Sequence, residues 1–125
     1  YPVIGVNNHM GSRFTANRAG MEPCLAIIEE KNLFFLDSLT SSQSVGYSLA
    51  GEMGLRTAKR DLFLDNSQDK DDIIKQLASL ALIARKRGVA IGIGHPYPAT
   101  LEALQEYQEK LQEQVTVVSV HRFMQ

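Results

Sequence analysis

Histidine and aspartate residues stand at the ends of short apolar runs in this chain of 125 residues. His9 follows the first run and His95 the fourth, while Asp37 and Asp65 follow the second and the third. Imidazole exchanges protons near neutral pH and binds divalent metals, and a carboxylate can orient a base, bind a metal or hold a substrate hydroxyl. These residue types indicate acid–base or metal-assisted chemistry, provided that the fold brings the ends of the runs together.

His9 lies in a loop sequence that suits a metal ligand. Two asparagines, Asn7 and Asn8, precede it, and Gly11 lets the backbone turn closely. A neutral imidazole nitrogen binds divalent metals while an acceptor fixes the other ring nitrogen. The alternative is an ordinary surface histidine, and a closed metal site typically needs three protein ligands and a water.

Asp37 and Asp65 are candidate catalytic residues because each ends an apolar run, where an ionised carboxylate needs partners. The alternative is that each caps the segment after it, helped by the neighbouring Ser38, Thr40 and Asn66. The sequence leaves both interpretations open.

His95 follows an apolar run and precedes Pro96, which stiffens the loop. This position suits a general acid or base, and the alternative is a histidine that only hydrogen-bonds its own loop. Arg13 and Arg60 are candidates for holding an anionic or transition-state oxygen. For Arg60 the default expectation is a surface ion pair with its neighbour Asp61.

Three further polar features have structural interpretations. Cys24 lies on an expected apolar helix face with no histidine near it in sequence, so we expect a buried, inert thiol. We expect His121, close to the end of the chain, to be exposed. The acidic cluster Asp69–Asp72 should be the N-terminal charge of a helix, because the glycine and spacing of a calcium loop are missing.

Alternating strands and helices must position these residues. Successive apolar runs start about 26 to 30 residues apart, close to the length of a βαβ unit. We expect strands at Val3–Val6, Leu33–Leu36, Leu62–Leu64, Val89–Ile93 and Val115–Val120. Apolar residues at helical spacing predict helices at Met21–Lys31, Gln43–Met53, Asp69–Arg87 and Pro98–Gln114.

The expected strands are continuously apolar, which is typical of a parallel sheet covered by helices on both faces. We therefore predict an α/β fold with a mainly parallel sheet, either a doubly wound open sheet or part of a (β/α) barrel. Five strands and four helices amount to about half of a roughly 250-residue barrel. The carboxyl ends of parallel strands meet at one edge, so the candidate residues should converge there. No linker interrupts the chain, and residues 1–125 are expected to form a single domain portion.

The composition excludes several classes of protein. With 44% hydrophobic residues, 22% charged residues and a net charge of −1, the chain should bury a core, and nothing in its charge favours binding to nucleic acid. No stretch approaches the roughly 18 apolar residues of a membrane span. One cysteine excludes an internal disulfide. The start, Tyr1-Pro2-Val3, is neither an initiator methionine nor a signal-peptide head, so we expect a piece of a longer protein.

Four blocks of sequence together resemble the divergent polysaccharide deacetylase family. Their order and spacing match that family, and the resemblance runs over nearly the whole chain. The blocks are Gly5–Thr15, Phe35–Ser38, Arg60–Asn66 and Ile93–Pro96. The family belongs to the NodB-like deacetylase superfamily, whose members adopt a distorted (β/α) barrel and typically remove acetyl groups from polysaccharide amino sugars with a divalent metal. The resemblance thus implies part of such a barrel and a metal-dependent hydrolase acting on a cell-envelope polysaccharide.

The resemblance also implies roles for single residues. His9 would bind the metal, zinc or a similar ion, and His95 would protonate the leaving amine. Asp37 and Asp65 would contact the metal ligands or the substrate. The implied mechanism is polarisation of the acetyl carbonyl by the metal, attack by a metal-bound water and delivery of a proton to nitrogen. The residues expected to contact the carbohydrate substrate are Asn8, Ser12, Arg13, Arg60 and Asn66.

The chain departs from the family in one respect. Family members carry an aspartate pair on the first barrel strand and a further histidine-containing loop upstream of the asparagine–histidine block, and neither occurs here. The chain resembles the C-terminal half of the domain, so we expect the remaining metal ligands and the catalytic base to come from outside it. Alone it should bind metal weakly and be inactive. A half barrel also has unpaired edges, which predicts association with the missing N-terminal half or with itself. A cell-envelope or periplasmic location is implied by the family alone.

Two other functions stay open at this point. One is a non-catalytic envelope protein that binds glycan on the same scaffold, because fold relatives can lose chemistry. The other is a hydrolase of another bond, such as a phosphoester, in which Arg13 and Arg60 hold the anion. An acetate-release assay beside a phosphate-release assay separates deacetylation from phosphoester hydrolysis.

Overall fold

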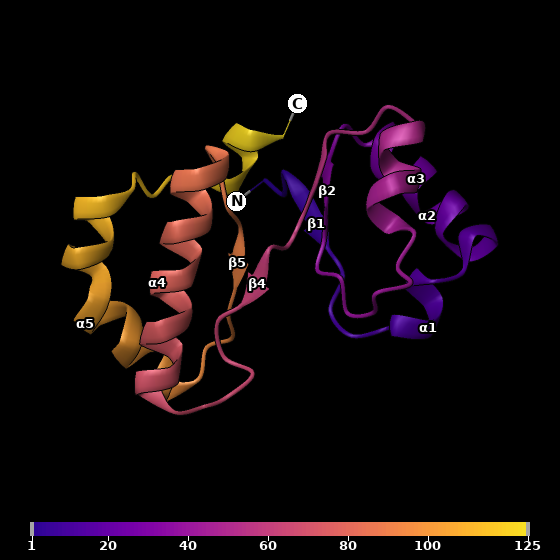
Figure 1. The fold of residues 1–125 in the computed structure, drawn as a ribbon. Helices are drawn as coiled ribbons and strands as arrows, with labels where there is room; N and C mark the ends of the chain where they lie inside the picture. Colours follow the sequence, from indigo (N-terminus) through magenta and orange to yellow (C-terminus); the bar gives the residue numbers. More distant parts are fainter. Residues whose placement is uncertain (1, 125) are drawn as a thin grey trace. The chain divides into compact units, whose positions relative to one another are not determined.

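The computed structural model describes residues 2–124, in which the chain divides into two compact units. The first unit comprises residues 2–59 with residues 120–124, and the second comprises residues 60–119. Figure 1 shows their helices and strands. Each unit has parallel strands and its own hydrophobic core.

The first unit is built on a three-stranded parallel sheet. Its elements are β1 (Gly5–Asn7), α1 (Ser12–Thr15), α2 (Arg18–Glu30), β2 (Phe34–Asp37), α3 (Gly46–Glu52), β3 (Thr57–Lys59) and a short 3-10 helix, η1 (Val120–Phe123). The strand order is β1-β2-β3, and the register pairs Val6 with Phe35 and Leu36 with Ala58. All four residues of the central strand β2 are buried.

Helices α2 and α3 pack on this sheet through one apolar cluster, and Figure 1 shows both on the same side of β2. The cluster joins Leu25 of α2, Phe35 of β2 and Leu49 of α3. Burying each side chain of this size contributes about 1.5–3 kcal/mol. Helix α3 begins at the buried Gly46, where a Cβ atom would lie 2.9 Å from Oδ2 of Asp37 and 2.8 Å from the Phe35 ring. Glycine therefore lets the start of α3 approach the end of β2 closely.

The second unit pairs two short parallel strands with two long helices. Its elements are β4 (Leu62–Phe63), α4 (Lys70–Arg87), β5 (Gly92–Ile93) and α5 (Pro98–Gln114). Helices α4 and α5 lie side by side (Figure 1). Their shared core contains Leu64, Ile73, Leu77 and Ala103, with Tyr107 and Leu111 packed against it.

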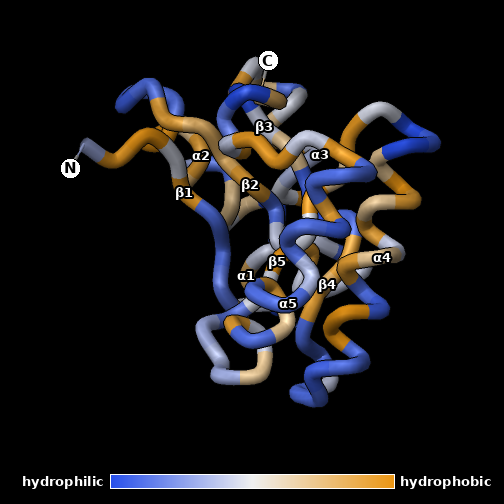
Figure 2. The backbone as a smooth tube through the Cα atoms, turned by 90° about the vertical axis from the view of Figure 1, so that its left-hand side faces the viewer, coloured by the Kyte–Doolittle hydropathy of each residue, from blue (hydrophilic) through white to orange (hydrophobic). Residues whose placement is uncertain are grey.

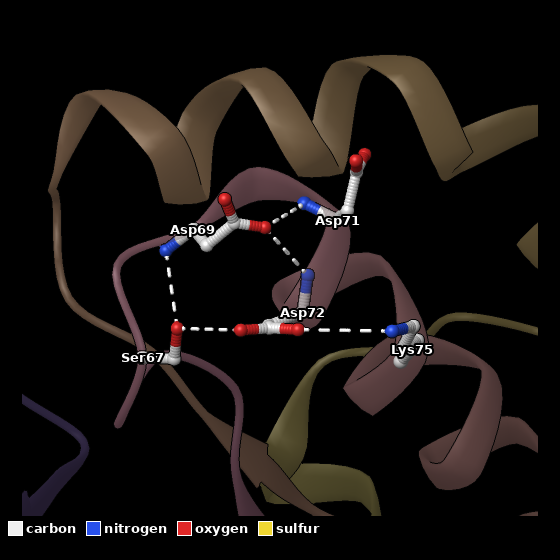
Figure 3. A network of polar contacts seen from close by, with 5 residues as sticks. All are labelled: Ser67, Asp69, Asp71, Asp72 and Lys75. Carbon is white, nitrogen blue, oxygen red and sulfur yellow. Dashed lines mark hydrogen bonds and ion pairs between the residues drawn. The ribbon is translucent and has the colours of Figure 1, made fainter.

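Helix α4 begins with the acidic cap that the sequence predicts. Asp69 precedes the helix, and its Oδ1 atom accepts hydrogen bonds from the backbone N–H groups of Asp71 and Asp72 at 3.0 and 3.2 Å. Figure 3 shows this network, in which the Ser67 hydroxyl donates to Asp72 and Lys75 forms an ion pair with it. The acidic cluster is therefore helix N-terminal charge, as expected.

The alternation of strands and helices and the parallel pairing confirm the predicted α/β class. Neither sheet closes on itself within residues 2–124, so these residues hold no closed barrel. Strands occur at the first four apolar runs and helices at all four predicted segments, with shifted ends. The single-domain organisation of residues 1–125 stays a prediction. No helix between residues 2 and 124 is long and apolar enough to cross a bilayer.

One predicted strand, Val115–Val120, is wrong. Helix α5 ends at Gln114, residues 116–119 are irregular, and Val117 is 63% exposed, so no neighbouring strand covers this apolar run. The sequence analysis missed β3, whose residues are not an apolar run. Backbone hydrogen bonding to β2, rather than side-chain hydropathy, makes β3 a strand.

One prediction of burial is also wrong. Cys24 is exposed on α2, because the buried face of this helix runs through Leu25 and Cys24 falls outside it. On α5, Leu101 and Leu104 are exposed. The buried face of this helix passes through Ala103, which packs in the core, and Tyr107 and Leu111 pack against that core.

Candidate active site

In the second unit, Asp65 and His95 form a hydrogen-bonded pair just after β4 and β5. The parallel register pairs Phe63 with Ile93, which brings the positions two residues further along each strand side by side. Oδ1 of Asp65 lies 2.8 Å from Nδ1 of His95. Oδ2 accepts hydrogen bonds from the His95 backbone N–H and, at 2.8 Å, from the Thr100 hydroxyl. Asp65 is buried and the His95 side chain is 29% exposed, so a buried carboxylate holds one edge of a partly exposed imidazole.

The hydrogen bonds decide the charge of Asp65. Burial raises the pKa of this carboxyl group because it removes water from the charged form. The bonds from the backbone and ring of His95 and from the Thr100 hydroxyl outweigh burial and hold the pKa below its ordinary value of 3.8. Asp65 is therefore ionised at neutral pH. An ionised carboxylate only accepts hydrogen bonds, so Nδ1 of His95 carries the hydrogen of this bond.

Two aromatic rings lie beside the imidazole of His95, and a guanidinium group lies over one of them. The ring of Phe63 lies 6.3 Å from it between centroids, and the ring of Tyr97 lies 5.4 Å from it. The guanidinium carbon of Arg60, a candidate substrate residue, lies 3.9 Å from the centroid of the Phe63 ring. Arg60 therefore lies against the Phe63 ring, which in turn lies next to the imidazole of His95.

Two neighbouring candidates have other surroundings. The ion pair expected between Arg60 and Asp61 is wrong, because Asp61 pairs with Arg87 at 2.7 Å and accepts the backbone N–H of Ile91. These bonds link the start of β4 to the end of α4 and the approach to β5. Asn66, a candidate substrate residue, is exposed directly after Asp65.

The candidate residues of the first unit follow β1, where Asn8 and His9 lie in the loop and Ser12 and Arg13 in α1, or end β2, as Asp37 does. Figure 2 shows the tube changing from hydrophobic to hydrophilic where β1 ends. Oδ1 of Asn8 accepts the backbone N–H of Ser38 at 2.8 Å. The Ser12 hydroxyl donates to the carbonyl of Thr40 at 3.0 Å, and the Thr40 hydroxyl donates to the carbonyl of Met10 at 3.3 Å. The segments that follow β1 and β2 are thus joined by side-chain to backbone hydrogen bonds.

Asp37 is completely buried at the end of β2. Its Oδ1 atom accepts the backbone N–H of Leu39 at 2.9 Å, and Oδ2 accepts the Ser44 hydroxyl at 2.8 Å and the backbone N–H of Tyr47 at 2.9 Å. These bonds hold the loop between β2 and α3, which is the arrangement expected of a capping residue. The catalytic role of Asp37 stays a prediction.

The possible metal ligands near His9 lie in the part of the chain after β1. His9 is exposed on the loop after β1, and Arg13 is exposed in α1. Nδ2 of Asn8 is buried with no hydrogen-bond partner in the part of the chain that the structure describes. Among residues 2–124, no three His, Cys, Asp or Glu side chains form a group that could hold a metal. The metal site at His9 and its further ligands stay predictions. Because His9 and His95 belong to different units, their convergence stays a prediction.

Comparisons with known proteins decide the family. A match to the family described as divergent polysaccharide deacetylase covers residues 2–124. The chain belongs to this family. It is 41% identical over 116 residues to the uncharacterized protein YibQ of Escherichia coli K12, and 43% identical over 118 residues to an uncharacterized protein of Haemophilus influenzae. These matches cover 93% and 94% of the chain but 36% and 42% of the two relatives.

A solved structure shares the fold of this divergent polysaccharide deacetylase chain. The crystal structure of uncharacterized protein ATU2773 from Agrobacterium tumefaciens C58 matches with a TM-score of 0.91 at 29% identity. The match covers 96% of the chain and 49% of the solved chain. The chain thus spans less than half the length of its curated relatives and about half of the solved protein, as expected for part of a longer domain.

The sequence analysis missed three residues of this site, which are Phe63, Tyr97 and Thr100. Phe63 and Thr100 have no local signal, because they meet the Asp65–His95 pair only through the fold. Tyr97 did carry a signal, since it stands between Pro96 and Pro98 at the start of a predicted helix, where a capping residue is usual. These residues and the Asp65–His95 pair all come from the second unit of the divergent polysaccharide deacetylase chain.

Proposed function

We propose that the complete protein is a metal-dependent hydrolase that removes acetyl groups from amino sugars of a cell-envelope polysaccharide. Family membership supports the substrate class. The Asp65–His95 pair carries the proposal, because it combines a group able to exchange protons with a carboxylate that orients it. A location in the cell envelope or periplasm is proposed on the same ground, since the substrate lies there.

Deacetylation requires a proton for the leaving amine. A base from outside this chain takes a proton from water as the water oxygen adds to the acetyl carbonyl carbon. The C–N bond then breaks with its electron pair passing to nitrogen, the nitrogen takes up a proton, and the acetic acid formed ionises to acetate. His95 supplies this proton from Nε2, the ring nitrogen remote from Asp65. The Nδ1 hydrogen stays on His95 in its bond to Asp65, and the negative charge of Asp65 stabilises the imidazolium form before the Nε2 proton leaves. Thr100 and the His95 backbone N–H keep Asp65 ionised.

A divalent metal, zinc or a similar ion, belongs to the proposal as the Lewis acid for the acetyl oxygen. His9 is its proposed ligand from this chain, and the further ligands come from outside the described residues. We also propose that Arg60, 3.9 Å from the Phe63 ring, contacts the carbohydrate close to His95. The other proposed substrate contacts are Asn8, Ser12, Arg13 and Asn66.

The test measures acetate release from N-acetylglucosamine oligosaccharides by the full-length protein. His95→Gln removes the proton donor and should lower kcat by about 10²–10⁴-fold without changing metal content. His9→Ala should lower the metal content instead. His121→Gln is the matched control, because His121 is an exposed histidine in η1 with no role in this proposal.

Each result has a defined meaning. A fully active His95→Gln protein would exclude His95 from the reaction. Sugar binding without acetate release would indicate a glycan-binding protein on the same scaffold. Release of phosphate but not acetate would indicate a phosphoester hydrolase.

A further inference from the structure

The imidazole of His95 is restrained by more than Asp65. Its plane makes angles of 26° with the Phe63 ring and 27° with the Tyr97 ring, at centroid distances of 6.3 and 5.4 Å. These are the separations of stacked aromatic pairs. Asp65 fixes the Nδ1 edge of the ring, while the two aromatic rings restrict the orientation of its plane.

Tyr97 occupies a position where its residue type does not favour the helix. It is the residue before the first turn of α5, and its side chain makes no capping hydrogen bond. The hydroxyl of Thr100, in the first turn of α5, is bonded to Asp65. Serine, threonine, aspartate or asparagine would stabilise this helix start, and tyrosine does not. Residue types that destabilise a helix or strand locally are expected at functional positions.

The backbone holds Tyr97 against His95. Its N–H donates to the carbonyl of His95 at 2.8 Å, and Pro96 and Pro98 restrict the chain on either side. Little freedom is therefore left in the segment that carries the ring. Tyr97 therefore leaves the start of α5 without a side-chain cap and holds its ring beside the imidazole of His95.

Phe63 is anchored from the other strand of the pair. It lies in β4 in register with Ile93 of β5, and its carbonyl accepts a hydrogen bond from Gln76 of α4 at 3.1 Å. The guanidinium of Arg60 lies over its ring. Phe63 is thus a fixed surface next to the imidazole of His95.

We propose that Tyr97, together with Phe63, is a positioning residue for His95. The rings keep the imidazole from turning about its Cβ–Cγ bond, so that Nδ1 stays on Asp65 and Nε2 keeps one direction. The catalytic consequence rests on the proposed deacetylase function, whereas the restraint on the ring is a property of this chain alone. Tyr97 acts through His95 and does not itself transfer a proton.

The first experiment uses the full-length protein and needs no substrate. Tyr97→Ser removes the ring but supplies the missing capping hydroxyl, so α5 should keep its start, and Tyr97→Phe keeps the ring. Nitrogen-15 NMR of the His95 ring should show a single Nδ1-protonated tautomer with a slowly exchanging hydrogen in the unmodified chain and in Tyr97→Phe. Tyr97→Ser should show mixed tautomers and fast exchange, while the His121 signals stay unchanged.

The controls separate positioning from folding. If the backbone amide spectrum of Tyr97→Ser is not that of a folded chain, Phe63→Leu replaces it and should give the same change at His95. A folded variant of either kind with the tautomer and exchange of the unmodified chain would overturn the proposal.

The second experiment uses the full-length protein and acetate release. Tyr97→Ser should lower kcat by about 10–100-fold, because misplacing a reacting group by about 1 Å costs this much. KM should stay within about twofold and Tyr97→Phe should recover the rate, since the ring acts on the chemical step and not on binding. If the unmodified protein releases no acetate, the proposed function fails and the NMR result alone decides on positioning. If it is active and Tyr97→Ser has the same kcat, the positioning proposal fails.

Discussion

Replacing Asp65 by asparagine measures what the charge of this carboxylate contributes to stability. Asp65 is 4% exposed and accepts hydrogen bonds from the backbone and ring of His95 and from the Thr100 hydroxyl. Asparagine can keep its oxygen on the backbone N–H and the hydroxyl, but its NH₂ group then faces Nδ1 of His95, which must lose its hydrogen. Hydrogen bonds to charged groups contribute about 1.5–3 kcal/mol each and neutral ones about 0.5–1.5 kcal/mol. After part of the loss is offset by removing a buried charge, the free energy of unfolding should fall by about 1–3 kcal/mol.

The effect should depend on pH, because the pKa of Asp65 is lower in the folded chain than its ordinary value of 3.8. A group whose pKa is lowered by folding stabilises the fold fully above its unfolded pKa. This stabilisation is lost as the pH falls through the folded pKa, where the carboxyl becomes protonated in both states. The difference between the unmodified chain and Asp65→Asn should thus be constant near neutral pH and shrink below pH 3.8.

Urea unfolding of both chains at a series of pH values provides the measurement. Asp71→Asn is the matched control. Asp71 is an exposed aspartate in the first turn of α4 and makes none of the hydrogen bonds that hold Asp65. It should change the free energy of unfolding little over the same range. Equal stability of the unmodified chain and Asp65→Asn at pH 7, or a difference that stays constant through acid pH, would refute the argument.

Three further tests address separate parts of the structure. Asp37→Asn turns an NH₂ donor toward the N–H or hydroxyl donors of the loop before α3, so the free energy of unfolding in urea should fall by about 1–3 kcal/mol. Ser44→Ala should lower it less. An unchanged free energy would mean that these buried hydrogen bonds do not hold the loop. Gly88 ends α4 with φ 90°, so Gly88→Ala should cost about 1–2 kcal/mol and lower Tm, whereas an unchanged Tm would show that the turn can relax. Cys24 is exposed, so a thiol reagent should label the folded chain at the rate seen in urea, and protection from the reagent would contradict this exposure.

Features that depend on near neighbours in sequence could be predicted. Helix α4 is the clearest case, because the residues of its cap, its acidic first turn and its basic last turn all lie within residues 69–88. The apolar runs likewise indicated the positions of β2 and β4. These elements are determined by local spacing, and the structure has them close to the predicted positions.

Features that depend on distant partners could not be predicted. The run Val115–Val120 has the composition of a strand but no strand beside it, while β3 has a strand beside it but an unremarkable composition. Arg60 was expected to pair with Asp61, yet Arg87, 26 residues away, provides the guanidinium that Asp61 binds. In each case the deciding contact is created by the fold.

Asp37 and Asp65 show how distant contacts separate two residues that look alike in the sequence. Asp37 ends β2, Asp65 follows β4 by two residues, and both are buried and accept three hydrogen bonds. The donors to Asp37 lie within 10 residues of it, so its bonds organise its own loop. The donors to Asp65 lie 30 and 35 residues away, and one of them is an imidazole. The register of β4 against β5 therefore makes Asp65, rather than Asp37, the carboxylate that can act through a histidine. A shift of that register would separate Asp65 from His95 and weaken the fold and the proposed proton transfer together.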